Sequence, residues 1–411
     1  MAQQQLPRDG ALAIVLHTHM PYVEGFGTWP FGEEWLFEAL ATCYLPLAKR
    51  LEVARNENPA AQITLSLTPV LGDQLAAPIA ERFKAFCGEL REQTHQLDID
   101  DATGSDVASA LEHSRSVYRA ALNSFEEQGD DGLAVLLAHA QWTSSATHAL
   151  LPLIATDAGL RLQIETGIES HRVRTGDFHG GFWLPECAWT PWLEDSLAEA
   201  GVKRTCLDLT DHFGEGAIEH LRPLRLASGI DVLPLDRQTV ELVWSPAGYP
   251  GAAAYCDTHH LTERDHLAWS NDGQPYDPDR AFAQAKADAE DFVERTQQRL
   301  RIASSGLGQS ALSLCALDTE LLGLWWREGV EWLGFVIEAA QEAGLALVAA
   351  DAVDIGALAA PVSAESLPTS SWGQPRTLET WTSPAVFDLV RSARRAELDL
   401  VDAADDSVVS K

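Results

Sequence analysis

Short apolar runs alternate with longer stretches of helical periodicity along most of the chain, and this alternation restricts the fold more than any other feature. Apolar runs of this length are typical of buried strands in a parallel sheet, and the helical stretches are typical of the crossovers between such strands. The pattern therefore predicts parallel β/α units. The predicted strands are Ala11–Leu16, Ile63–Leu67, Leu133–Ala138, Gly181–Leu184, Thr205–Leu207, Val240–Val243, Leu312–Leu317 and Leu345–Ala349.

Polar or aromatic residues follow each predicted strand closely. In chain order they are His17, Thr68, His139 with Gln141, Glu186, Asp208, Trp244, Asp318 and Asp351. In a β/α barrel the carboxyl ends of the strands meet on one face, where active sites are built from several loops. We therefore expect these side chains to gather at one site.

The remaining segments suggest a simple domain organisation. Residues 10–360 are expected to form the catalytic barrel, and residues 79–128 hold two helical patterns that predict a helical insertion. Asp277–Leu300 reads as an amphipathic helix. Residues 361–411 are expected to form a short helical C-terminal extension, with a helix from about Ala385 and an acidic tail at its end.

Charge and cysteine usage restrict the partners. The chain of 411 residues carries 61 Asp plus Glu against 29 Lys plus Arg, a net charge of −32. Such a field repels nucleic acid and anionic lipid, so we expect a neutral substrate, no nucleic acid and no membrane partner. No apolar run approaches the roughly 20 residues of a membrane span, and the start has no signal pattern. Six scattered cysteines without a CxxC pair indicate reduced thiols, so the expected location is the cytoplasm.

The first chemical motif is His17-Thr18-His19, at the end of the first predicted strand. Alternate residues of a strand project in related directions, so both imidazoles face one space. Three interpretations stand at this point: a metal site, with ligands such as His139, His148, His179, Asp208 and Asp318; a pair that hydrogen-bonds a neutral sugar; or satisfied core histidines.

The second and third motifs each place a carboxylate at a strand end among aromatic residues. Glu186 lies between Trp183 and Trp189, and Asp318 is followed by Trp325 and Trp326. Two carboxylates that face each other across a sugar are what glycosidic bond chemistry requires, because one attacks or activates water and the other protonates the leaving oxygen. Thirteen tryptophans add flat faces that stack on pyranose rings.

With these motifs in place, the sequence resembles glycoside hydrolase family 57, in particular its subgroup of 1,4-α-glucan branching enzymes. The resemblance runs from His17 to about Trp381. It is carried by His17–Val23, Trp29–Glu34, Leu67–Leu71, Ala146–His148, Phe182–Glu186, Gly248–Gly251, Pro275–Pro278, Asp318–Trp326 and Ser371–Gly373.

The resemblance implies an incomplete (β/α)7 TIM-like barrel and a retaining reaction on an α-glucan such as amylose or a glycogen-like polymer, without metal or cofactor. It implies Glu186 as the nucleophile and Asp318 as the general acid and base. The residues it implies for substrate binding are His17, His19, Trp29, His148, Tyr249, Trp269, Trp325, Trp372 and Trp381, with Tyr249 at the start of a loop that closes over the site.

The chain also departs from the family pattern. The loop Trp244–Tyr249 is short and lacks an Asp and a Tyr, Leu324 replaces a histidine, Gln374-Pro375-Arg376 replaces a glycine-rich stretch, and the helical segment after Trp381 is short. We therefore expect branching with a raised share of hydrolysis. The alternatives are an α-amylase or 4-α-glucanotransferase of the same family, a catalytically weakened glucan-binding homologue, and, more distantly, a barrel metallohydrolase.

Overall fold

Strand β1 (Ala11–Thr18) lies at the centre of the fold. The computed structural model describes residues 6–27 and 32–403, and in it all eight residues of β1 are buried. Such a strand needs cover on both faces, which is typical of parallel sheets. β1 pairs in parallel with β2 (Thr64–Leu67) on one side and with β8 (Leu312–Asp318) on the other.

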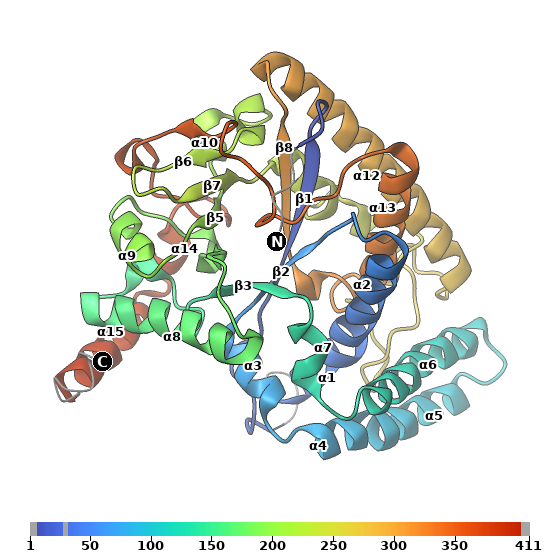
Figure 1. The fold of residues 1–411 in the computed structure, drawn as a ribbon. Helices are drawn as coiled ribbons and strands as arrows, with labels where there is room; N and C mark the ends of the chain where they lie inside the picture. The colour runs from blue at the N-terminus through green and yellow to red at the C-terminus, as the bar shows by residue number, and fades with distance from the viewer. Residues whose placement is uncertain (1–5, 28–31, 404–411) are drawn as a thin grey trace.

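The strands follow one another around a ring (Figure 1). One sheet has the order β4-β3-β2-β1-β8, and a second has the order β5-β7-β6-β9. A parallel bridge between Gly181 and Arg204 joins β4 to β5. The main-chain N–H of Asp236, just after β7, donates to the carbonyl of Leu314 in β8 at 2.9 Å. Seven parallel strands of the described chain thus form an incompletely bonded ring, and the predicted (β/α)7 barrel is confirmed.

The remaining strands are β3 (Ala140–Ser144), β4 (Phe182–Trp183), β5 (Arg204–Leu207), β6 (Leu224–Arg225), β7 (Asp231–Pro234) and β9 (Ala360–Pro361). The α-helices are α1 (Glu34–Ala39), α2 (Leu45–Glu57), α3 (Pro69–Ala76), α4 (Ala80–Ala85), α5 (Glu92–Asp101), α6 (Asp106–Glu127), α7 (Gly132–Leu137), α8 (Asp157–Thr175), α9 (Leu193–Glu199), α10 (Thr210–Phe213), α11 (Arg237–Val243), α12 (Pro278–Leu307), α13 (Gly329–Ala343), α14 (Glu379–Thr382) and α15 (Phe387–Ala403).

Side chains alternate between the two faces of β1 and β8, so each strand contributes to two separate parts of the core. Ala11, Ala13 and Val15 belong to the cluster inside the barrel, together with the alternate residues 312, 314 and 316 of β8. Leu12, Ile14 and Leu16 pack instead in the cluster under the surrounding helices. Because side chains alternate along a strand, the next inward positions are His17 on β1 and Asp318 on β8. The strands therefore aim two candidate site residues into the barrel.

Three of the predicted strands were wrong. Residues 133–137 of the predicted strand Leu133–Ala138 lie in α7, which Asp131 caps by accepting from the N–H groups of residues 133 and 134, both at 3.0 Å. Val240–Val243 is the last turn of α11, and the strand that precedes this helix is β7. Leu345–Ala349 forms no regular strand: it has one parallel bridge, between Leu347 and Leu12, with main-chain hydrogen bonds from Leu12 to Ala346 and from Val348 to Leu12 at 2.9 and 3.0 Å. An apolar run of four to six residues fits a buried strand and a buried helix turn equally well, which explains these errors.

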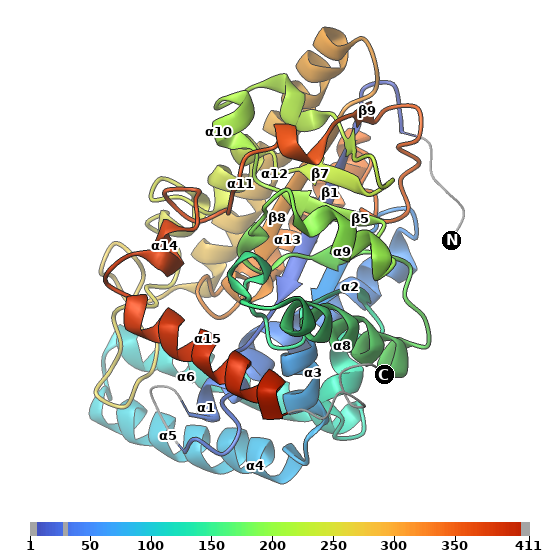
Figure 2. The same cartoon turned by 90° about the vertical axis from the view of Figure 1, so that its left-hand side faces the viewer.

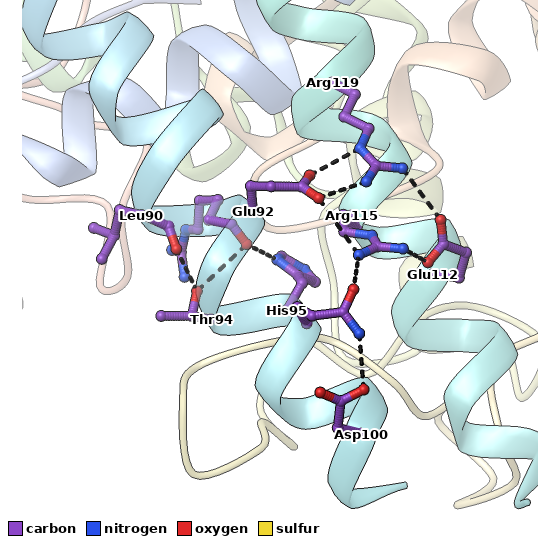
Figure 3. A network of polar contacts seen from close by, with 10 residues as sticks. Leu90, Glu92, Thr94, His95, Asp100, Glu112, Arg115 and Arg119 are labelled. Atoms are coloured by element: carbon purple, nitrogen blue, oxygen red, sulfur yellow. Dashed lines mark hydrogen bonds and ion pairs between the residues drawn. The ribbon is translucent and has the colours of Figure 1, made fainter. Parts of the chain in front are cut away.

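Helices α4, α5 and α6 fill most of the predicted insertion. α5 and α6 are joined by ion pairs, and Figure 3 shows Arg119 and Arg115 of α6 facing Glu92 of α5. The guanidinium of Arg119 donates to Glu92 at 2.8 Å. His95 of α5 is buried and contacts Ser114 of α6 at 3.1 Å. The two helices are therefore held as one unit.

Two further predicted helices are present as α12 and α15, although α12 continues to Leu307, beyond the predicted end at Leu300. Asp277 caps α12 by accepting from the N–H groups of residues 279 and 280, so the helix begins where the sequence predicts. α15 lies beside α8 (Figure 2), where Glu397 accepts from the N–H groups of Ala155 and Thr156 at 2.8 and 2.9 Å. Most of the predicted acidic tail, residues 404–411, lies outside the described residues.

Replacement of Gly167 by Ala tests the packing of α8 on β3. A Cβ at this glycine would lie 2.1 Å from the carbonyl oxygen of Ser144, so helix and strand would have to separate. We expect the free energy of unfolding to fall by about 1–3 kcal/mol, measured by denaturant unfolding. Gly251→Ala is the control, because its Cβ would have only one neighbour, at 3.8 Å. Equal stability of the two variants would contradict this account of the packing.

Candidate active site

Three imidazoles meet at the end of β1. His17 Nε2 lies 2.9 Å from His148 Nε2, and the His19 and His148 rings stack with centroids 3.8 Å apart. His17 also stacks on Trp183, the inward residue of β4, at 4.5 Å. His148 reaches this position from the loop after β3 with a φ of 58°, which few non-glycine residues adopt. The structure thus brings together residues from three strand ends.

Burial keeps these imidazoles neutral at pH 7. It lowers the pKa of His17 and His148 well below the usual value, and the neighbouring imidazoles lower both further. Burial also lowers the pKa of His19 to about 4. A neutral imidazole offers one N–H donor and one acceptor, which suits a sugar hydroxyl. Within residues 6–27 and 32–403, no group of three or more His, Cys, Asp or Glu side chains is arranged to hold a metal ion.

Glu186 lies in a short 3₁₀ turn, Pro185–Cys187, directly after β4. Its φ of 58° is a strained conformation of the kind that gathers at functional sites. Trp372 holds it twice: the indole N–H donates to Oε2 at 3.1 Å, and the main-chain N–H donates to the Glu186 carbonyl at 3.0 Å. Burial raises the pKa of the Glu186 carboxyl, and the hydrogen bond from Trp372 limits the rise.

Asp318 ends β8 and pairs in register with His17 of β1. Burial raises the pKa of its carboxyl well above the usual value, and the like charges of Glu320 and Glu186 raise it further. The site therefore contains two carboxyls, at the carboxyl ends of β4 and β8, whose negative charges repel each other. At neutral pH this environment favours a proton on Asp318.

A buried ion pair fixes the segment that carries Trp372. Arg237 donates to Asp208 Oδ2 at 2.7 Å through Nε, and a second guanidinium nitrogen bonds the carbonyl of Trp372. Asp208 is fully buried and also accepts from the hydroxyl of Thr210 at 2.6 Å. The end of β5 thereby positions the indole that contacts Glu186.

The other aromatic residues predicted to bind substrate lie farther from these contacts. Trp325 is half exposed, and its carbonyl accepts from the Thr258 hydroxyl. Trp269 stacks on His260 with ring centroids 4.0 Å apart. Trp381 lies on α14 near Gly373, and Trp29 lies outside the described residues.

Tyr249 points toward helix α12. Its hydroxyl donates to Asp291 Oδ2 at 2.8 Å, and it lines a cavity of about 570 Å³ between α11 and α12. The histidines, Glu186 and Asp318 do not line this cavity. In this structure the loop that carries Tyr249 is therefore fastened to the outer helix.

Trp183, Ser66 and Glu320 were missed as site residues by the sequence analysis, whereas Thr68 was expected there because it follows a predicted strand. Trp183 stacks on His17, Ser66 lies 3.4 Å from His17 Nδ1, and Thr68 lies 3.3 Å from His19 Nδ1. Glu320 raises the pKa of Asp318. All four lie at or just after strand ends, so their place in the chain was the available signal.

Several known proteins are similar to this chain in sequence and in fold. A probable 1,4-alpha-glucan branching enzyme from Mycobacterium tuberculosis is 32% identical, over 94% of this chain and 78% of the relative. The crystal structure of a GH57-type branching enzyme from Pyrococcus horikoshii has a TM-score of 0.85 and 30% identity, covering 92% of this chain and 76% of that one.

The crystal structure of the alpha-amylase AmyC from Thermotoga maritima shares the fold, with a TM-score of 0.80 and 23% identity over 97% of this chain and 84% of that one. The sequence model of glycosyl hydrolase family 57 matches residues 13–349, which span all seven strands of the ring. The chain therefore belongs to glycosyl hydrolase family 57.

Proposed function

We propose that the protein is a retaining 1,4-α-glucan branching enzyme, which cuts an α-1,4 bond and rejoins the released glucan as an α-1,6 branch. The observation that carries the proposal is the pair Glu186 and Asp318, at the ends of β4 and β8, in which the charge of one raises the pKa of the other. Relatives named as branching enzymes support the same activity. We expect the two carboxyls to lie about 5 to 6 Å apart, as in retaining pairs.

In the first step, Glu186 would attack the anomeric carbon while Asp318 protonates the leaving oxygen. Trp372 occupies Oε2 of Glu186, which leaves Oε1 as the attacking atom. When the glucosyl ester forms, Glu186 loses its negative charge, and this removes one cause of the raised pKa of Asp318. Asp318 then becomes the base that takes the proton of the acceptor hydroxyl.

The neutral histidines would hold hydroxyls of the sugar at the cleavage point, since each can donate and accept one hydrogen bond. Trp269, Trp325, Trp372 and Trp381 would stack on sugar rings along the bound chain. No helix in the described part of the chain is long and apolar enough to span a membrane. All six cysteines are buried free thiols, which supports a reducing compartment and our proposal of the cytoplasm.

Incubation with amylose tests the proposed function. We expect new α-1,6 linkages after debranching and linkage analysis, because the intermediate can pass to a sugar hydroxyl. We also expect fewer of them than new reducing ends, since the loop before Tyr249 is short and water reaches the intermediate. A ratio of new α-1,6 linkages to new reducing ends well above one would contradict the expected share of hydrolysis. Products without any α-1,6 linkage would indicate an amylase or a 4-α-glucanotransferase, and an unchanged polymer would indicate a binding protein.

Substitution of each carboxyl should distinguish the two roles. Glu186→Gln and Asp318→Asn should each lower kcat on amylose by at least about 10³-fold, with glucan binding retained. With an aryl α-maltooligosaccharide whose leaving group needs no acid, Asp318→Asn should regain turnover, and azide should accelerate it. Glu186→Gln should not regain the retaining reaction, because the ester cannot form. The reverse pattern, read from product anomer and rate, would exchange the assigned roles.

Replacement of Trp372 by Phe should shift the acidic limb of the pH profile. The Trp372 hydrogen bond limits the pKa of Glu186, so its loss should raise that pKa and move the acidic limb of kcat/KM to higher pH. Trp244→Phe is the matched control, because Trp244 contacts Trp372 edge-on at 5.7 Å and makes no hydrogen bond to Glu186. Identical acidic limbs in both variants would show that the indole N–H does not tune the nucleophile.

A further inference from the structure

Glu320 lies buried in the 3₁₀ turn η7 (Thr319–Leu321) that follows β8. Its Oε1 accepts two hydrogen bonds, one from the Tyr44 hydroxyl at 2.6 Å and one from the main-chain N–H of His19 at 3.1 Å. Tyr44 belongs to the π-helical turn η1 (Leu40–Tyr44), and His19 follows β1. One carboxyl therefore joins three separate segments around the catalytic centre.

Two further bonds fasten the same turn. The hydroxyls of Thr18 and Thr319 lie 2.7 Å apart, and the Cys43 thiol donates to the carbonyl of Thr319 at 3.2 Å. These contacts fix the backbone immediately after Asp318. The position of the Asp318 carboxyl is thus set from both sides, by the register of β8 with β1 and by the anchored turn.

The two neighbouring carboxyls differ in their hydrogen bonding. Glu320 receives two donors, which stabilise its charged form. The described structure records no donor to the carboxyl of Asp318, and burial is the first cause of its raised pKa. When two nearby carboxyls share one proton, the one without donors keeps it. The proton therefore belongs on Asp318 and the charge on Glu320.

We propose that Glu320 is a positioning residue that acts through Asp318: it anchors the turn after Asp318 through its bonds to Tyr44 and His19 and, when ionised, supplies a negative charge that keeps the proton on the general acid. This inference rests on the proposed function only for the role of that proton. The coupling between the two carboxyls belongs to the protein itself and can be measured without substrate.

The charge on Glu320 depends on a small set of groups. The Tyr44 phenol on η1 donates to it. Besides burial, the charge of Glu320 raises the pKa of the Cys43 thiol and of the Asp318 carboxyl, and the charge of Glu186 also raises the pKa of Asp318. Burial raises the pKa of Glu320 to about 7, and its hydrogen bonds limit the rise. Glu320 is therefore ionised above neutral pH, where an acid that must stay protonated most needs help.

Glu320→Gln removes the charge and keeps the shape, since the amide oxygen can still accept from Tyr44 and His19. On an unactivated maltooligosaccharide, we expect kcat/KM at pH 8.5 to fall on the order of tenfold, with less than about a twofold change at pH 5.5. With a good aryl leaving group the loss at pH 8.5 should disappear, because the step no longer needs the acid. Tyr44→Phe should give a smaller change in the same direction.

Glu328→Gln is the matched control. Glu328 is also buried and accepts from the main-chain N–H of Cys256 at 3.1 Å, so this substitution removes a buried carboxyl outside the site. We expect Glu328→Gln to leave the alkaline limb of the pH profile of kcat/KM where it is in the wild-type protein. An alkaline limb that does not move in folded Glu320→Gln, or that moves equally in Glu328→Gln, would overturn the inference.

Infrared difference titration gives a second readout that needs no activity. The band of the protonated Asp318 carboxyl, identified by its loss in Asp318→Asn, should disappear at lower pH in Glu320→Gln than in the wild-type protein. If the wild-type protein cleaves no glucan but this shift is found, the proposed function fails and the coupling stands. Identical titrations in the two proteins would overturn the coupling whatever the activity.

Discussion

The parallel pairing of β1 with β8 is the constraint on which the site depends, because its register sets His17 opposite Asp318. Small inward residues such as Ala11, Ala13 and Ala316 fill the barrel below this level. The two strands lie far apart in the sequence, so the group proposed as the catalytic acid is placed only when β1 and β8 pair. Without this register, the contacts of η7 with β1 could not form.

Around that pair, burial away from water is the first cause of the shifted pKa values. The same burial that lowers the pKa of the histidines raises the pKa of the carboxyls, so neutral forms of both are favoured where a neutral sugar would bind. Burial raises the pKa of Glu186 as well, but Trp372 donates to its carboxylate and limits the rise. One hydrogen bond thus distinguishes the group proposed to attack from the group proposed to protonate.

Part of this arrangement could be predicted from the sequence. The barrel, and the strand-end positions of His17, Glu186 and Asp318, followed from apolar runs that end in reactive residues, whereas His148 entered as a possible metal ligand and through the family resemblance. The runs Leu133–Ala138 and Val240–Val243 were misassigned because four to six apolar residues contain too little periodicity to separate a helix from a strand. The role of Glu320 could not be predicted, because its partner Tyr44 lies 276 positions away and only the folded chain brings them together.

The buried titratable groups of the site also lower the stability of the folded protein. The histidines bind protons less readily in the fold than in the unfolded chain, so they lower stability as pH falls below their ordinary value near 6.5. Asp318 and Glu320 hold protons more readily in the fold, so they lower stability as pH rises above about 4. The pH range in which the histidines lower stability overlaps the range in which the carboxyls lower it, so at every pH at least one of these groups destabilises the folded protein. The apolar layers of the barrel must supply the stability that the catalytic centre removes.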